Sequence, residues 1–194
     1  MNELLDLLDW KRRIAELYAY ARSVPAKRGW HLWREGRAEL FATHPQSPNP
    51  HTQPSYFDYD PEMRAAGEVV PAPPEAVDLP VSRDEVISAT RFGCVRFDLR
   101  GTAAQLDLFW IRGYGGGLFL PFSDATSGHS TYGAGRYLYD TIKGADLGAE
   151  DRKLVLDFNF AYNPSCAYDP RWACPLAPPG NRLDVAIEAG EKAP

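Results

Sequence analysis

Residues 93–112 read GCVRFDLRGTAAQLDLFWIR, and this stretch carries the pattern that decides the fold. In its first half Val95, Phe97 and Leu99 alternate with charged residues. A second alternating run occupies residues 105–112, after a short spacer of small residues that begins with glycine. Alternation with a period of two is typical of strands with one buried face, and the spacer has a length suited to a hairpin. The stretch therefore predicts two antiparallel strands.

Further strand signals follow in the second half of the chain, with no helical pattern between them. They are GLFLPF at 117–122, GRYLYD at 135–140 and KLVLDFNF at 153–160. Consecutive short strands without intervening helices imply antiparallel pairing, in a barrel or in a sandwich. The 17 prolines and 16 glycines also argue against an all-helical bundle. We expect a mainly β protein, α+β by content, with an antiparallel barrel-like or sandwich sheet.

The N-terminal part of the chain has helical periodicity instead. Residues 2–22 repeat their leucines near helical spacing, and Asn2 is suited to cap the first turn. Residues 27–43 predict a second helix with tryptophan and phenylalanine on one side, which ends before Pro45. We expect both helices to pack on the sheet.

The length of 194 residues suits one domain with its own core. Between the helices and the strands the chain is rich in proline and short of periodicity, and there we expect one short strand near Glu68–Val70. A second proline-rich stretch, 161–180, predicts an ordered loop. The single domain 1–194 therefore divides into N-terminal helices at 1–45, a proline-rich wrapping segment at 46–83 and a β-rich body at 84–194.

The net charge of −5 bears on the class of partner. Nucleic-acid binding needs a basic face that displaces counterions, and acidic residues are mixed through the Lys and Arg clusters of this chain. No apolar run approaches the roughly 20 residues that cross a bilayer. The N-terminus MNELLDLLDWKRR is acidic where a signal peptide is basic. We expect a cytoplasmic protein with no nucleic-acid and no membrane partner, and the oligomeric state stays open.

The strand expected at 153–160 would place Val155, Asp157 and Asn159 on the face opposite its core residues. Asp157 and Asn159 would lie about 7 Å apart along the strand, a spacing that suits one polar ligand, one arginine or one loop. Two alternatives stay open. The face is a solvent-facing surface, because polar outer faces are the rule in antiparallel sheets, or the carboxylate holds the proline-rich segment that follows.

A dense set of hydroxyl, carboxyl and imidazole groups comes shortly before Arg136 in the sequence. Asp and Ser side chains in such a run can cap nearby backbone amides, which makes turn chemistry one interpretation. In the other interpretation His129 acts as an acid or base near neutral pH. The members of the set are Asp124, Thr126, Ser127, His129, Thr131 and Tyr132.

Arg136 and Arg182 are the candidate anion-binding residues, because a guanidinium makes paired hydrogen bonds to carboxylate or phosphate. The simpler interpretation pairs them with Asp124 or Asp157 as structural ion pairs.

Cys166 and Cys174 lie close together in the sequence, within SCAYDPRWAC. A zinc site would need two more ligands, no second cysteine pair exists, and the histidine donors are distant in sequence. We expect no metal, no cofactor and no zinc at this pair. A redox pair or a nucleophile would need exposure and an activating base, which the sequence does not reveal. Buried reduced thiols are therefore the default interpretation.

Longer motifs join these residues. The chain reads FSDATSGHSTYGAGRY at 122–137 and LDFNFAYNPSCAY at 156–168, followed by CPL and NRL. Together they resemble the motifs of a bacterial family known as domain of unknown function 1684. The resemblance extends over nearly the whole chain and is firmest over 122–192. Family members commonly have proline and glutamate where this chain has Ala177 and Gly180.

The resemblance implies a shared architecture and a shared site, in a family without an established activity, substrate or cofactor. It carries over as candidate site residues those that stand in matched motifs, namely Asp124, Thr126, Thr131, Tyr132, Arg136, Asp157, Asn159, Tyr162, Asn163, Cys166, Cys174, Asn181 and Arg182.

Three hypotheses for function follow. In the first, the protein binds a small polar or anionic metabolite in a cleft of a barrel, roofed by the 161–180 loop and walled by Tyr132 and Tyr162. In the second, it is an enzyme such as a hydrolase, with His129 or Asp157 as base and Cys166 as nucleophile. In the third, the motif is architectural and function resides in contacts with partners.

Overall fold

The computed structural model describes residues 2–194. Among these residues there are two helices, followed by seven strands in one sheet with the order β5-β4-β3-β2-β1-β7-β6. All neighbouring strands in it are antiparallel. The elements are α1 (Glu3–Arg22), α2 (Ala26–Thr43), β1 (Arg64–Pro80), β2 (Val86–Leu99), β3 (Thr102–Ile111), β4 (Gly117–Phe122), β5 (Arg136–Asp140), β6 (Ala149–Glu150) and β7 (Lys153–Asp157), with 3₁₀ turns at Pro61–Met63, Thr141–Lys143, Phe158–Phe160 and Ser165–Ala167.

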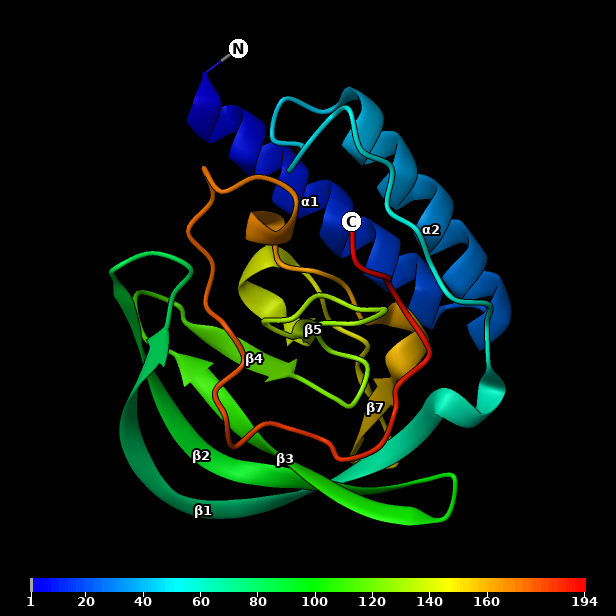
Figure 1. The fold of residues 1–194 in the computed structure, drawn as a ribbon, viewed down its shortest axis with the longest axis vertical. Helices are drawn as coiled ribbons and strands as arrows, with labels where there is room; N and C mark the ends of the chain where they lie inside the picture. Colours follow the sequence, from blue (N-terminus) through cyan, green and yellow to red (C-terminus); the bar gives the residue numbers. More distant parts are fainter. Residues whose placement is uncertain (1) are drawn as a thin grey trace.

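The sheet curves strongly, and the two helices lie across the open side of the curve (Figure 1). The space between the long strands and the helices is occupied by β5, β7 and the last part of the chain, drawn in orange and red. The expectation of a mainly antiparallel β protein with two N-terminal helices is therefore confirmed.

The hairpin predicted at 93–112 is present as β2 and β3, which pair antiparallel through residues 89–111. Its turn consists of Arg100 and Gly101, whose φ angles are 54° and 77°. Positive φ at both central residues is the requirement of a tight two-residue hairpin turn, and glycine adopts it without a steric penalty. The alternating sequence therefore folds locally as its pattern predicts.

The sheet is open and does not close into a barrel. Its edge strands are β5 and β6, and no ladder among residues 2–194 joins them. The free edge of β5 is already used, because Tyr137 and Tyr162 exchange backbone hydrogen bonds of 2.9 and 3.1 Å. At the other edge β6 has only two residues. The barrel-like alternative is wrong, and the sandwich-like alternative describes the protein.

The proline-rich segment holds far more strand than expected. Instead of a short strand near 68–70, β1 runs for 17 residues. Its first part pairs with β7 and its remainder with β2. The register shifts between Pro71 and Glu75, where two further prolines lie. Proline is tolerated at such an irregularity because its missing N–H is not needed for the ladder there, so proline content did not preclude a long strand.

The stretch 153–160 is a strand only up to Asp157. There the Asp157 side chain accepts a hydrogen bond from the backbone N–H of Asn159, and a 3₁₀ turn follows. Both faces of the stretch are buried, and Val155, Asp157 and Asn159 are at most 8% exposed. The solvent-facing alternative is therefore wrong, because the helices cover the face that an antiparallel sheet often leaves to water.

The two expected helices are present with the expected ends to within a residue. The Asn2 side chain accepts a hydrogen bond of 2.9 Å from the N–H of Leu4, as a capping residue should. The helices approach closely at Gly29, where a Cβ atom would lie 2.7 Å from the carbonyl oxygen of Ala21. Neither α1 nor α2 contains an apolar stretch of the length that a bilayer-crossing helix needs.

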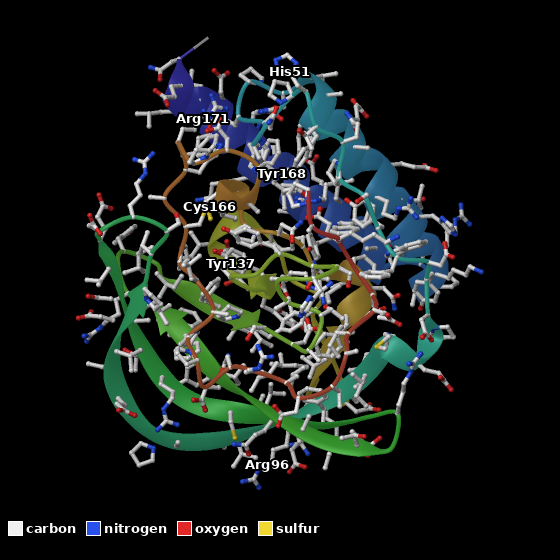
Figure 2. All side chains as sticks on the ribbon, in the orientation of Figure 1. His51, Arg96, Tyr137, Cys166, Tyr168 and Arg171 are labelled. Carbon is white, nitrogen blue, oxygen red and sulfur yellow. The ribbon has the colours of Figure 1, made fainter. Side chains whose placement is uncertain are left out.

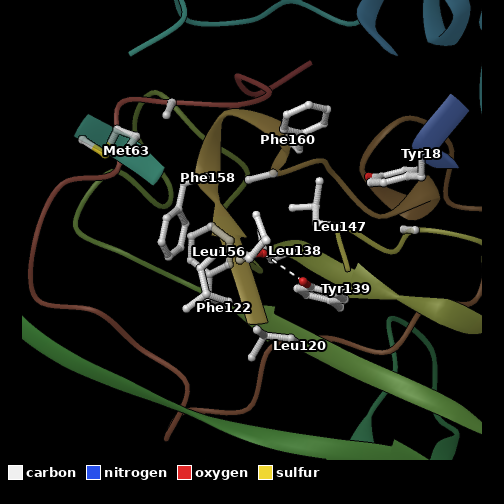
Figure 3. Packing of buried hydrophobic residues seen from close by; sticks show 14 of the residues in the cluster. Tyr18, Met63, Leu120, Phe122, Leu138, Tyr139, Leu147, Leu156, Phe158 and Phe160 are labelled. Atoms are coloured by element: carbon white, nitrogen blue, oxygen red, sulfur yellow. Dashed lines mark hydrogen bonds between the residues drawn. The ribbon is translucent and has the colours of Figure 1, made fainter. Parts of the chain in front are cut away.

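The main core lies between the helices and the inner face of the sheet. Phe122, Leu138, Leu156 and Phe158 come together there from three strands and the 3₁₀ turn after β7 (Figure 3). The Tyr139 hydroxyl donates to the Val155 carbonyl at 2.8 Å, and this bond ties β5 to β7 inside the core. Burial of these large side chains is the main favourable term that holds helices and sheet together.

The C-terminal segment, residues 181–192, is not a strand, and buried and exposed residues alternate along it, with Leu183, Ile187 and Ala189 among the buried ones. Arg136, which is 1% exposed, supplies hydrogen-bond donors to the backbone of this segment. The guanidinium donates to the carbonyl oxygens of Ile187, Ala189 and Glu191. Its counter-charge is Asp124, with 2.9 Å between Nη2 and Oδ2. Asp124 is fully buried as well.

Replacing Asp124 by Asn should lower the free energy of unfolding by about 3–5 kcal/mol, because the guanidinium of Arg136 would stay buried without its counter-charge. Urea denaturation measures the loss. The matched control is Glu75→Gln, which breaks the exposed Arg91–Glu75 pair with the same 2.9 Å separation. That change should leave the free energy of unfolding nearly unchanged. Equal losses for the two variants would contradict a special role for the buried pair.

Candidate functional site

The hydroxyl-rich run before β5 forms a buried turn. Asp124 Oδ1 accepts hydrogen bonds from the N–H of Thr126 at 2.7 Å and from its hydroxyl at 2.5 Å. The hydroxyl groups of Thr126 and Thr131 lie 2.8 Å apart. His129 is exposed at the tip of this turn. The turn-chemistry interpretation therefore accounts for the three buried residues, and they are brought together with Arg136.

The two candidate arginines have different environments. Arg136 pairs with Asp124, as the structural interpretation expected, and burial lowers the pKa of its guanidinium while Asp124 opposes that shift. Arg182 is exposed, and no carboxylate in the described residues lies within ion-pair distance of it. The two arginines do not converge on one anion.

The three candidate asparagines act as substitutes for backbone partners. Asn159 accepts from the N–H of Asp60 at 2.9 Å and donates to its carbonyl oxygen at 2.8 Å. Asn181 does the same to Asp107, at 2.9 and 3.0 Å. Asn163 donates to the carbonyl of Lys192 at 2.7 Å. A side-chain amide carries the same donor and acceptor as a peptide group, so each asparagine joins a loop to the core.

A buried carboxylate that the sequence analysis missed connects these loops. Glu191 is 0% exposed, and its two oxygens accept four hydrogen bonds. The donors and distances are Arg37 Nε at 2.6 Å, the Tyr56 hydroxyl at 3.2 Å, the Asn163 N–H at 2.7 Å and the Tyr168 hydroxyl at 2.9 Å.

One signal in the sequence pointed to Arg37, a member of this cluster. Arg37 lies four residues after Trp33 and four before Phe41, so a charge stands in the middle of an apolar helix face. Such a charge indicates a buried partner. Nothing in the local sequence around Glu191 identified that partner, because only the tertiary fold brings the two together.

A cavity with a volume of about 460 Å³ lies between the α1–α2 turn and the β6–β7 hairpin. We call it the Asp157 cavity. Its walls are mostly apolar, with Leu147, Val155 and Phe160 among them. Its charged lining residues are Arg22, Arg64, Glu150 and Asp157.

Asp157 is held in this cavity with its two oxygens in different environments. Oδ1 accepts from the backbone N–H of Asn159 at 3.1 Å and from its side-chain amide at 2.8 Å. Oδ2 lies 3.9 Å from Arg64 Nε, and no residue among 2–194 donates a hydrogen bond to it. Burial raises the pKa of Asp157 to about 6, against the hydrogen bonds from Asn159 and the charge of Arg64. Arg64 is shared with Glu150, at 2.6 Å.

The cleft that was expected under the 161–180 loop is much smaller than the Asp157 cavity. The cavity there has a volume of about 40 Å³ and is lined by Tyr18, Asp140, Tyr162 and Asn163 among others. Such a volume accommodates one or two water-sized molecules at about 30 Å³ each. Tyr132 does not line it and instead contacts Cys166. The two tyrosines predicted as facing walls therefore belong to different surroundings.

Cys166 and Cys174 are adjacent in space. The N–H of Cys166 donates to the sulfur of Cys174 at 3.3 Å, and the Tyr132 hydroxyl lies 3.9 Å from the sulfur of Cys166. No hydrogen bond in the described structure joins His129 or Asp157 to Cys166, so the base and nucleophile of the hydrolase hypothesis are not assembled. No group of three or more His, Cys, Asp or Glu side chains in residues 2–194 is arranged for a metal ion.

The comparison with protein families is specific. A family model described as protein of unknown function (DUF1684) matches residues 51–192. The chain belongs to this family. The match starts after α2, so the two helices lie before it, and it includes all the candidate site residues. The resemblance read from the motifs is thus confirmed for the family, while its bacterial origin stays a prediction.

A solved relative of this DUF1684 protein shares the fold. The solution NMR structure of an uncharacterized protein of Haloarcula marismortui is 36% identical and has a TM-score of 0.59. The match covers 82% of this chain and 89% of that one. Among curated proteins none matches this chain. The comparisons therefore establish family and fold.

The raised pKa of Asp157 predicts a pH-dependent effect of Asp157→Asn. The folded state holds the Asp157 proton more tightly than the unfolded state, so the carboxylate destabilises the fold increasingly as pH rises from 3.8 to about 6. The difference between those two pKa values corresponds to about 3 kcal/mol. Part of this change has already occurred at pH 4, just above the unfolded value, so the free energy of unfolding of Asp157→Asn relative to wild type should increase by about 2 kcal/mol from pH 4 to pH 7, measured by urea denaturation.

The matched control for this series is Asp151→Asn, because Asp151 is an exposed carboxylate in the turn of the same hairpin. The difference in free energy of unfolding between Asp151→Asn and wild type should not change over the same pH range. A flat profile for Asp157→Asn as well would show that the cavity does not perturb Asp157.

Proposed function

We propose that this protein binds a small polar molecule in the Asp157 cavity, with Asp157 Oδ2 as the hydrogen-bond acceptor. One observation carries the proposal. The Asp157 side chain is almost fully buried, yet its Oδ2 faces a cavity and has no hydrogen-bond donor from the described chain. A ligand that supplies a hydroxyl or amino group would provide that donor.

The size and lining of the cavity support the same reading. A volume of about 460 Å³ lies within the range of small-molecule sites, which combine apolar walls with a few convergent polar groups. Val155 and Phe160 would contact an apolar part of the ligand, while Arg22 and Arg64 stand where an anionic group could bind. We infer a hydroxy or amino compound with a short carbon skeleton, with or without a carboxylate.

The site differs from the one drawn from the sequence. Asp157 is retained from that prediction, whereas Arg136, Asn159 and Asn181 serve the fold. Binding at the remaining predicted residues stays a prediction, as does the cytoplasmic location.

A thermal-shift panel of small hydroxy acids, amino acids and polyols tests the proposal on the full chain. A ligand at a hundredfold excess over its dissociation constant should raise the melting temperature by about 5–10 °C. Two variants locate the site. Asp157→Asn removes the acceptor charge, and Ala26→Trp fills the cavity from the start of α2. Both should abolish the shift, while the exposed Asp151→Asn should keep it.

A panel without any stabilising compound would count against the proposal. An unchanged shift in both cavity variants would overturn it outright, because the ligand would then bind elsewhere.

A further inference from the structure

The two neighbouring cysteines differ in their accessibility. Cys166 lies in the 3₁₀ turn Ser165–Ala167 and is half-buried, whereas Cys174 is 1% exposed. Figure 2 shows Cys166 on the orange loop, in the space between the curved sheet and the helices. A reagent from solution can therefore reach one sulfur of the pair more readily than the other.

The loop holds the two residues in fixed positions. Two hydrogen bonds anchor Cys174 to Ser82. The Ser82 N–H donates to the Cys174 carbonyl at 3.0 Å, and the Cys174 N–H donates to the Ser82 hydroxyl at 3.1 Å. Arg83 donates to the Pro170 carbonyl at 3.0 Å, inside the loop between the two cysteines. The Cys166 N–H then contacts the Cys174 sulfur directly, at 3.3 Å. The pair is thus pre-positioned by several independent contacts.

The surroundings favour the thiolate of Cys166. A hydrogen bond with the Cys174 thiol, and beyond it bonds with Ser82 and Tyr132, lower the pKa of Cys166 to about 6 against the opposing effect of burial. The interaction with Cys166, together with burial, raises the pKa of Cys174. The thiolate is the nucleophile in thiol–disulfide exchange. The more accessible member of the pair is therefore also the one that carries more thiolate at neutral pH.

We propose that Cys166 and Cys174 form a thiol–disulfide redox site that reacts with small-molecule disulfides, with Cys166 as the attacking and Cys174 as the resolving cysteine. This site is independent of the Asp157 cavity, which neither cysteine lines.

The reaction has two exchange steps. The Cys166 thiolate attacks one sulfur of a small disulfide, so a mixed disulfide forms at Cys166 and one small thiolate leaves. Cys174 then loses its proton to solvent and attacks the Cys166 sulfur, which expels the second small thiolate and forms the Cys166–Cys174 bond. The protein dithiol is oxidised by two electrons and the small disulfide is reduced to two thiols. The Cys166 turn must move so that the two sulfurs come to the bonded distance of about 2.05 Å.

Mass spectrometry of the full chain tests the site with glutathione disulfide as the probe. Reduced wild-type protein should lose two hydrogens, and peptide mapping should find Cys166 joined to Cys174. Cys174→Ser should instead accumulate one glutathione on Cys166, because its resolving thiol is missing. Cys166→Ser should leave Cys174 unmodified. Cys94→Ser is the matched control, since Cys94 is also half-buried and lies away from the pair on β2, and it should behave as wild type.

The wild-type protein tests the proposal even if a variant fails to fold. A stable glutathione adduct on wild-type Cys166, without the internal disulfide, would overturn the assignment of Cys174 as the resolving residue. Modification of Cys94 before Cys166 would overturn the site itself. A Cys174→Ser protein that folds, as judged by circular dichroism, and keeps Cys166 reduced would also refute the proposal; Cys174→Ala provides a second variant for this arm.

Discussion

The structure depends on how the C-terminal segment is accommodated inside the molecule. A half-buried segment that is not part of a sheet leaves its inward-facing carbonyl groups without ladder partners, and buried backbone groups need partners. Arg136 meets this need with three carbonyl contacts, while Asp124 balances its charge. At the end of the same segment, Glu191 joins α2, the segment before β1 and the 161–180 loop through four hydrogen-bond donors. Each buried charge of this segment's contacts therefore has an opposite charge beside it.

This constraint explains much of the polar sequence on which the resemblance to the family was based. Asp124, Arg136 and the three asparagines are buried and hydrogen-bonded to protein partners. These residues therefore hold the loops against the core. Asp157 has a double role. Its Oδ1 ends β7 by capping the turn at Asn159, and its Oδ2 faces Arg64 at the Asp157 cavity. The motif therefore marks architecture and, at one position, the site that we propose.

Much of the fold was predictable because it follows from local patterns. Alternation predicted the β2–β3 hairpin, and helical spacing predicted α1 and α2. The length of β1 was not predictable from its prolines, because their cost depends on whether the N–H groups face a ladder or an irregularity. The sequence also could not predict whether the sheet closes, because the edge of β5 pairs with Tyr162, which comes from a distant loop.

The sequence by itself determined the antiparallel β class, the two helices, the family and a set of polar residues of uncommon density. It did so because strand alternation, helix periodicity and long motifs are properties of consecutive residues. The tertiary structure alone decided which of those polar residues are neutralised by partners, that Arg37 meets Glu191, that Cys166 meets Cys174, and that the main cavity opens beside Asp157. Burial and pairing arise from contacts between residues far apart in the chain, and no local pattern encodes them.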